Sequence, residues 1–519
     1  MRPGIKKRVR SLTINNRSFG HARQSGIALL VLMIAIALTI SAYYFSSISI
    51  VDIQVNNMDV TREALKDAKK ALLSYAVMHA GLNGAGTGAG SGDPGEYGYL
   101  PCPYITQALP SDEGQQNTSC GGKNISSIGY LPWKSLQSGI LKDGSGSCLW
   151  YAVSGSYKNW SNSELINEDT NGMFQIVDSS LVPNVIQGVQ AKDRVVAIVF
   201  APGATLATQN RDFNNASLCG RDGTNVSAYL EGSASTDNAT LTGVAEQIDQ
   251  FIHASITSDT AAVPYNDYFI TITRDEIWQA VMKTDLENKF AAAAEAVAYC
   301  LSEYVNHVDN PNKRLPWPAP LDLVDYSVLT NYDDVPAAAQ GYAGRFPLYI
   351  NDSNGLIVTS VEDEFLNPGV ATPPAGRICD SLNLPVAGLV NVDLTDEKEE
   401  LRVILNNWKD HLYYSASQSY SLPDVAWTGC GVSDCVEVAG NKYAAIIYFA
   451  GRKQGGQSRV FDTISLTDEK NDIFNYLENG NAAIFPDMIG NGAYNTAVLP
   501  SNDIMFCLTD SATPSVVPC

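Results

Sequence analysis

Few residues in this chain have the types and spacing that catalysis or metal binding requires. Two acidic turns, DTNG (169–172) and DSNG (352–355), offer oxygen ligands that suit Ca²⁺. Neither turn has the spaced carboxylates of an EF-hand, and both also fit plain Asx-turns. The sequence contains no HExxH zinc helix and no GxSxG nucleophile elbow. We therefore expect a protein that is not an enzyme and that has no cofactor and no metal, although the two turns leave Ca²⁺ open.

Cysteine oxidation is the chemistry that the sequence indicates most directly. All ten cysteines follow residue 100, and an even number in an exported chain predicts disulfides. Short separations favour Cys102–Cys120 and Cys430–Cys435, although sequence alone does not fix the connectivity. No CxxC pair is present, which disfavours zinc. The disulfide candidates are Cys102, Cys120, Cys148, Cys219, Cys300, Cys379, Cys430, Cys435, Cys507 and Cys519.

Charge is distributed unevenly along the chain. The 519 residues include 34 Lys and Arg against 55 Asp and Glu, a net charge of 34 − 55 = −21. Residues 1–26 nevertheless hold seven basic and no acidic residues, which leaves 27 − 55 = −28 for the remainder. An acidic body argues against nucleic-acid binding, because that affinity depends on Lys and Arg neutralising phosphates.

A charge-free apolar run, IALLVLMIAIALTISAYYF, extends from Ile27 to Phe45. A helix of this length spans roughly 28 Å, close to the hydrocarbon thickness of a bilayer. The basic residues before the run predict a cytoplasmic N-terminus and a periplasmic body. Three interpretations fit the run: a cleaved secretory signal, a plain uncleaved anchor, or a helix that is retained after removal of a basic leader.

The junction of basic leader, Gly26 and apolar helix resembles the prepilin leader of type IV pilins and type II secretion pseudopilins. The resemblance implies cleavage between Gly26 and Ile27 by a prepilin peptidase, and methylation of Ile27. It also implies that the apolar helix serves first as an inner-membrane anchor and then as the packed core of a filament. Other pilins or pseudopilins would then be partners through this helix.

Val31 departs from the pattern of the major subunits in that family. Major pilins carry Glu at the fifth mature position, and here that position is Val31. In this respect the chain resembles the large minor pseudopilin that lies at the filament tip. Cys507 and Cys519 could also close a C-terminal loop like the disulfide-bounded region of many pilins.

Short similarities recur in the same order through the body and predict an internal repeat. CLWYAVSGSY (148–157) matches HLYYSASQSY (411–420), RVVAIVFAPG (194–203) matches KYAAIIYFAG (442–451), and YLE occurs at 229–231 and 476–478. The apolar runs within these segments read as strands. A helical stretch from Arg274 to about His307 is expected to join the two copies.

We therefore predict an α+β fold: an N-terminal transmembrane or pilin helix followed by two duplicated modules. Each module is expected to pack a helix on an antiparallel sheet with long loops. The predicted segments are a leader (1–26), a transmembrane or assembly helix (27–50), a first module (51–285) and a second module (286–519).

The function that these expectations favour is that of a minor pilin-like subunit in a type IV pilus or type II secretion-like filament. Such a subunit would act at the tip or in assembly initiation, and would pass from the inner membrane to the pilus or cell surface. One alternative is a membrane-anchored adhesin that is not built into a filament, using its 25 tyrosines for contact. A periplasmic hydrolase with a carboxylate pair is a further alternative.

Overall fold

The computed structural model describes most of the residues from Ser25 to Cys519. The chain divides into two compact units, residues 1–58 and 59–519. Helix α1 (Ser25–Ser47) belongs to the first unit, and α2 (Ile50–Leu82) continues into the second. The residues outside the description are 1–24, 48–49, 83–96, 106–111, 123, 159–165, 181, 212–217, 220–223, 233–235, 258–260, 262–263, 307–309, 311, 337–340, 349–393, 422–426, 479 and 497–500.

The first sheet contains seven strands within the described residues, in the order β1-β2-β5-β3-β4 with β6 paired to β3 and β7 paired to β5. Its pairs are antiparallel except for β3 and β6. Every residue of the central strand β5 is buried, as its β-branched and aromatic composition predicts. The strands are β1 (Ser127–Tyr130), β2 (Trp150–Val153), β3 (Phe174–Asp178), β4 (Val185–Gln187), β5 (Val195–Ala201), β6 (Asp249–His253) and β7 (Tyr268–Thr273).

The second sheet, also of seven described strands, follows the order β14-β10-β11-β15-β16, with β9 paired to β11 and β8 paired to β9. Only β10 and β14 are parallel among its pairs. A third sheet is the two-stranded hairpin of β12 (Phe461–Asp462) and β13 (Thr467–Asp468). The second sheet consists of β8 (Ala343–Arg345), β9 (Leu412–Ala416), β10 (Val436–Val438), β11 (Asn441–Phe449), β14 (Ala493–Tyr494), β15 (Ile504–Thr509) and β16 (Val516–Pro518).

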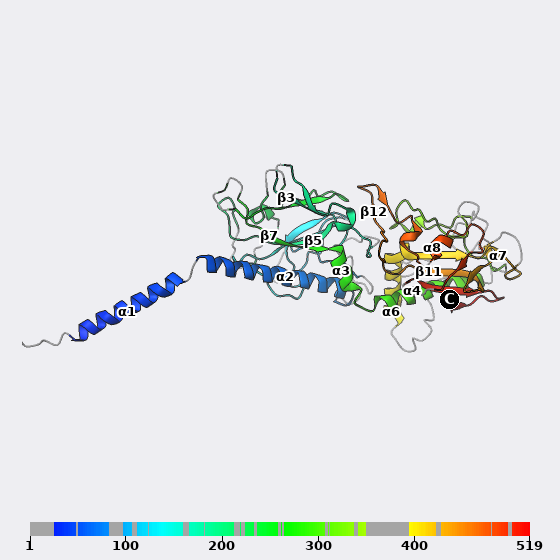
Figure 1. The fold of residues 1–519 in the computed structure, drawn as a ribbon, viewed down its shortest axis with the longest axis horizontal. Helices are drawn as coiled ribbons and strands as arrows, with labels where there is room; N and C mark the ends of the chain where they lie inside the picture. The colour runs from blue at the N-terminus through cyan, green and yellow to red at the C-terminus, as the bar shows by residue number, and fades with distance from the viewer. Residues whose placement is uncertain are drawn as a thin grey trace, which may run out of the picture. The chain divides into compact units, whose positions relative to one another are not determined.

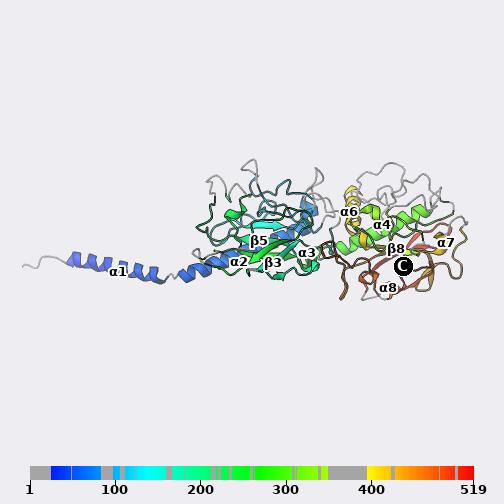
Figure 2. The same cartoon turned by 90° about the horizontal axis from the view of Figure 1, so that it is seen from above.

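Helices cover one face of each large sheet (Figures 1 and 2). Helix α2 lies alongside the sheet that holds β5 and β7, and α4 contacts β11 and β15. Thr273 begins α3 with a capping box in which its side chain and that of Glu276 each bond the other's backbone N–H. The remaining helices are α3 (Arg274–Val281), α4 (Leu286–Asn306), α6 (Leu394–Trp408) and the short α7 (Gln418–Ser421) and α8 (Asn481–Ile484).

One hydrophobic core joins both large sheets. Ala68 of α2, Val199 of β5, Val297 of α4 and Ile447 of β11 are all buried in the same cluster. Three smaller clusters are also described. Trp150 and Phe251 belong to one, Tyr448 and Phe485 to the second, and Val177, Ile252 and Tyr265 to the third. Residues 59–519 therefore fold as one compact unit.

The expectation of an α+β fold is confirmed, but the prediction of two duplicated modules is wrong. The structure contains several sheets with different strand orders, and the largest core runs through residues on both sides of position 286. The similar segments at 148–157 and 411–420 contain β2 and β9, and those at 194–203 and 442–451 contain β5 and β11. Local similarity predicted these strands correctly, because composition sets strand propensity, but it did not determine how the sheets and core are shared.

The prediction of a transmembrane helix over residues 27–50 is also wrong. Among the described residues, no helix combines the length and the apolar character needed to cross a bilayer. The single helix expected from Arg274 to about His307 is instead two helices, α3 and α4, separated by a turn at 282–285.

Candidate functional site

Helix α1 presents an apolar surface on all sides. Its described side chains, 29–43, are exposed without exception, and Leu29, Val31 and Leu38 are each at least 58% exposed. Gly26 and Ile27, the expected processing residues, lie at the start of α1, and Phe45 lies near its end. The side chains of these three residues are outside the description. Full burial of one large apolar side chain contributes about 1.5–3 kcal/mol. Binding of a partner that covers this helix is therefore favourable.

The next helix, α2, is amphipathic in the part that belongs to the second unit. Ala64, Ala68, Leu72 and Tyr75 are buried, and their spacing of three and four residues places them on one face of the helix. On the flank of this stripe, the Lys69 ammonium donates hydrogen bonds to the Thr271 carbonyl and the Glu276 carboxylate. The second unit therefore holds this part of α2 by both apolar and ionic contacts.

Four disulfides are described, and none of the described cysteines is free. Three of them, Cys102–Cys120, Cys430–Cys435 and Cys507–Cys519, join pairs that the sequence suggests. The fourth, Cys148–Cys219, spans 71 residues and could not be predicted from proximity along the chain. Cys300 is also disulfide-bonded, whereas Cys379 lies outside the described residues.

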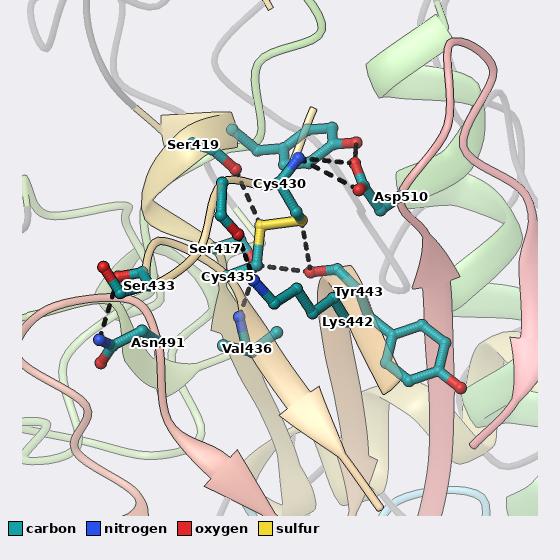
Figure 3. Close-up of a disulfide and its surroundings, with 12 residues drawn as sticks. Ser417, Ser419, Cys430, Ser433, Cys435, Val436, Lys442, Tyr443, Asn491 and Asp510 are labelled. Carbon is teal, nitrogen blue, oxygen red and sulfur yellow. Dashed lines mark hydrogen bonds between the residues drawn. A yellow bond between two sulfur atoms is a disulfide. The ribbon is translucent and has the colours of Figure 1, made fainter. Parts of the chain in front are cut away.

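The loop around Cys430 is fixed by more than its disulfide (Figure 3). The Cys430 backbone N–H donates to both carboxylate oxygens of Asp510 at 3.1 Å. The Tyr420 hydroxyl donates to one of these oxygens at 2.7 Å. On the other side of the bridge, the hydroxyl of Ser419 lies 3.0 Å from the sulfur of Cys435. This arrangement ties α7 and the loop before β10 to the end of β15, and its role is structural.

A buried cluster of charged side chains joins the loop at 167–172 to the second sheet. Asp169 Oδ2 accepts a 3.1 Å hydrogen bond from His411 Nε2, and its Oδ1 lies 3.2 Å from Lys453 Nζ. Lys470 Nζ pairs with Asp410, and Arg459 Nη1 lies 3.4 Å from Glu168 Oε1. The sequence favoured no role for His411 and an Asx-turn for Asp169, so this cluster was missed; no local signal links residues so far apart.

Electrostatics within the cluster favour ionised carboxylates. Burial acts to raise the pKa of Asp169, but the Lys453 ammonium and the His411 hydrogen bond hold that pKa well below its usual range. Burial likewise opposes ionisation of Asp410, and the Lys470 ammonium lowers its pKa. These carboxylates therefore contribute to stability as the anionic partners of buried cations.

Asp169, Asp410 and His411 lie close enough together to be considered as metal ligands. Their carboxylates, however, are already paired with ammonium groups, and a divalent cation would be repelled by Lys453 and Lys470. The rest of the DTNG turn is also occupied: Asn171 accepts from Arg274 and donates to the Phe461 carbonyl. The cluster thus fits an ion-pair network, and the second turn, 352–355, lies outside the described residues.

Two carboxyl pairs, each of a buried aspartate and a partly buried glutamate, occur at the YLE segments. The Glu231 N–H donates to Asp267 at 2.9 Å, and the Glu478 N–H donates to Asp503 at 3.2 Å. Burial and the neighbouring Glu231 raise the pKa of Asp267 well above its usual range. Burial and the Glu478 carboxylate raise the pKa of Asp503 to about 7. The repeated YLE was the sequence signal for these sites, but it did not reveal the aspartates.

Comparison of the chain with protein-family models, with curated proteins and with solved structures gave no match.

Proposed function

We propose that this chain is a minor pilin-like subunit of a type IV pilus or type II secretion-like filament, acting at the tip or in assembly initiation. The observation that carries the proposal is the exposed apolar surface of α1 over residues 29–43. This helix lacks a polar face, so helices of sister subunits that surround it would bury most of its area. The basic leader and the Gly26–Ile27 junction supply the processing signal that the family uses.

The size of the second unit supports a low copy number. Helices in contact pack with their axes roughly 8–10 Å apart. Residues 59–519 number 519 − 58 = 461, and a compact unit of that length has a radius of gyration of roughly 23 Å. Identical units of this size would obstruct one another if every helix of a filament carried one. Val31 in place of the Glu of major subunits points in the same direction.

The disulfides support a location outside the cytoplasm for the second unit. Four bridges are described there, and disulfides persist mainly in oxidising compartments. A filament subunit whose α1 is held at the assembly site while the second unit is exported meets this requirement. The adhesin alternative meets it too, and differs in predicting that the chain is recovered apart from any filament.

N-terminal sequencing of the protein from cells with active prepilin peptidase tests the proposal. We expect the mature chain to begin at methylated Ile27, and Gly26→Val to leave the leader attached. The matched control is Ser25→Ala, which alters the residue before the junction and should be processed normally. A wild-type chain that keeps Met1 in peptidase-positive cells, or that never sediments with filaments, would contradict the proposal.

A further inference from the structure

A cavity of about 220 Å³ lies where the β12–β13 hairpin meets the loop at 167–172. We call it the hairpin cavity; it is lined by Asn124, Asp169, Arg194, Glu246, Asp325 and Phe461, among others. It is smaller than the pockets of ~300–1,000 Å³ that hold drug-sized ligands. Its size therefore suits a ligand on the order of one sugar ring.

One buried polar atom of the cavity wall has no hydrogen-bond partner among the described residues. It is Arg194 Nε, a donor. Arg194 is 5% exposed and uses its two other nitrogens to bind Asp462 at 2.9–3.0 Å. A buried donor without a partner is costly, so a ligand oxygen that accepts a hydrogen bond would be stabilised here. Hydroxyl groups supply such an acceptor.

The charges of the lining residues do not balance. Asp462 is paired with Arg194, Asp169 with Lys453, and Lys470 with Asp410. Glu246 and Asp325 form no ion pair with a described cation. Their described bonds are to neutral groups: Asn124 donates to Glu246, and the hydroxyl and N–H of Ser327 donate to Asp325. The cavity thus carries two carboxylates that favour a cationic ligand.

The remaining wall supplies an apolar surface and a fixed backbone. Phe461 is half-buried, with its ring edge-on to Tyr326 at 5.2 Å, and offers a face for C–H groups. Asn124 and Glu246 both have left-handed backbones, with φ of 54° and 58°, and are joined by a 3.0 Å bond from the Glu246 N–H to the Asn124 carbonyl. Such conformations persist where the surroundings hold them, so the Glu246 side of the cavity is preformed.

We propose that the hairpin cavity binds a small polyhydroxylated cation of the amino-sugar class. A ligand hydroxyl would accept a hydrogen bond from Arg194 Nε, the ammonium would be stabilised by Glu246 and Asp325, and the ring would contact Phe461. This inference goes beyond the filament role and does not depend on it, because the cavity lies wholly within residues 59–519.

Calorimetric titration of the full chain, kept soluble in mild detergent, with glucosamine and with glucose tests the inference. We expect glucosamine to bind at least roughly fivefold more tightly than glucose, the effect of one partly solvated ion pair. The double variant Glu246→Gln/Asp325→Asn should bring the affinity for glucosamine down to that for glucose. Both substitutions conserve shape, and unchanged denaturation curves would show that the variant is folded.

A blocking variant separates the cavity from other binding surfaces. Thr463 is exposed and lines the cavity, so Thr463→Trp should abolish binding of both sugars. Leu466, in the same hairpin, is 89% exposed and does not line the cavity, so Leu466→Trp is the matched control and should bind normally. The inference would be overturned if neither sugar bound or if binding survived Thr463→Trp. Equal affinities for glucose and glucosamine would overturn it too.

Discussion

His411 Nε2 donates a 3.1 Å hydrogen bond to Asp169 Oδ2, which connects two buried side chains that are 242 residues apart in the sequence. The same carboxylate lies 3.2 Å from the Lys453 ammonium, so one buried anion joins the loop after residue 166 to two segments beside β9 and β11. Removal of either partner of a buried ion pair leaves the other charge uncompensated. The stability of residues 59–519 should therefore depend strongly on Asp169.

The first prediction concerns this anion. Asp169→Asn should lower the free energy of unfolding by about 3–5 kcal/mol, because it leaves Lys453 and its neighbours without a buried counter-charge. Urea denaturation followed by tryptophan fluorescence measures the change. Asp275→Asn is the control: Asp275 is 74% exposed at its side chain and pairs with Arg274 at 3.7 Å, so its loss should cost under about 1 kcal/mol. Equal costs for the two variants would contradict a central role for Asp169.

The second prediction concerns pH and the Glu478–Asp503 pair. Burial and Glu478 raise the pKa of Asp503 to about 7, whereas in the unfolded chain an Asp titrates near its ordinary value of about 4. Between these values the folded state retains a proton that the unfolded state has released, so this group's contribution falls as the pH rises from about 4 to about 7. Asp503→Asn imitates the protonated carboxyl. In this variant the free energy of unfolding should therefore fall with rising pH less steeply than in the wild type, by on the order of 1.4 kcal/mol per pH unit.

Denaturation at a series of pH values from 4 to 8 measures the decline, with Asp193→Asn, at an exposed position, as the control. The Asp169 and Asp410 pKa values are lowered, so their contribution is lost only below about pH 4, outside this window. The Glu231–Asp267 pair remains in the variant and keeps part of the slope. Parallel pH profiles for Asp503→Asn and the wild type would show that Asp503 does not hold a proton in the folded state.

The third prediction compares two disulfides. Cys148–Cys219 closes a loop of 71 residues and Cys430–Cys435 a loop of 5. In the chain-entropy model, loss of the long bridge costs about 4 kcal/mol and loss of the short one about 2 kcal/mol. Denaturation of Cys148→Ser/Cys219→Ser and Cys430→Ser/Cys435→Ser gives the two values. A larger loss for the second variant would indicate that the bonds of Asp510 to the Cys430 loop matter more than loop entropy.

The fourth prediction tests the shared core. Trp278 of α3 and Trp408 of α6 meet edge-on with ring centres 5.5 Å apart, and both are buried. Trp408→Ala should cost about 3–5 kcal/mol, whereas Phe474→Ala, at a side chain that is 60% exposed, should change stability by about 0.5 kcal/mol or less. With Trp278→Ala in a double-mutant cycle, the coupling should be about 0.5–1.5 kcal/mol. Additive losses would show that the two rings do not interact.

The fifth prediction tests the assembly role of α1. Ile34 is 50% exposed, and Ile34→Asp would place a charge within packed apolar helices, where an unpaired carboxylate is costly. The variant should disappear from the sedimented filament fraction, while Ile34→Leu should be retained there. Thermal unfolding of residues 59–519 should be unchanged in both variants, since Ile34 belongs to the other unit. Normal recovery of Ile34→Asp with filaments would contradict the assembly role.

The local elements of this fold can be predicted from the amino-acid sequence. Composition predicts the strands β5 and β11 and the apolar helix α1. Short separation along the chain predicts the pairs Cys102–Cys120 and Cys430–Cys435, and the resemblance to pilins suggests Cys507–Cys519. These features depend on neighbours within one helix or strand, or on a short loop, so nearby residues suffice to encode them. The leader at Gly26–Ile27 and the filament function remain predictions from the sequence.

The contacts between distant segments, in contrast, are known only from the folded chain. Repeated segments suggested two modules, yet the core includes Val199 and Ile447 together, and the sheets differ in strand order. The sequence favours an Asx-turn at Asp169, whereas in the folded chain its buried carboxylate accepts a hydrogen bond from His411. The reason is physical: the pKa of a carboxyl, the partner of an ion pair and the walls of a cavity depend on charges and packing supplied by residues hundreds of positions away.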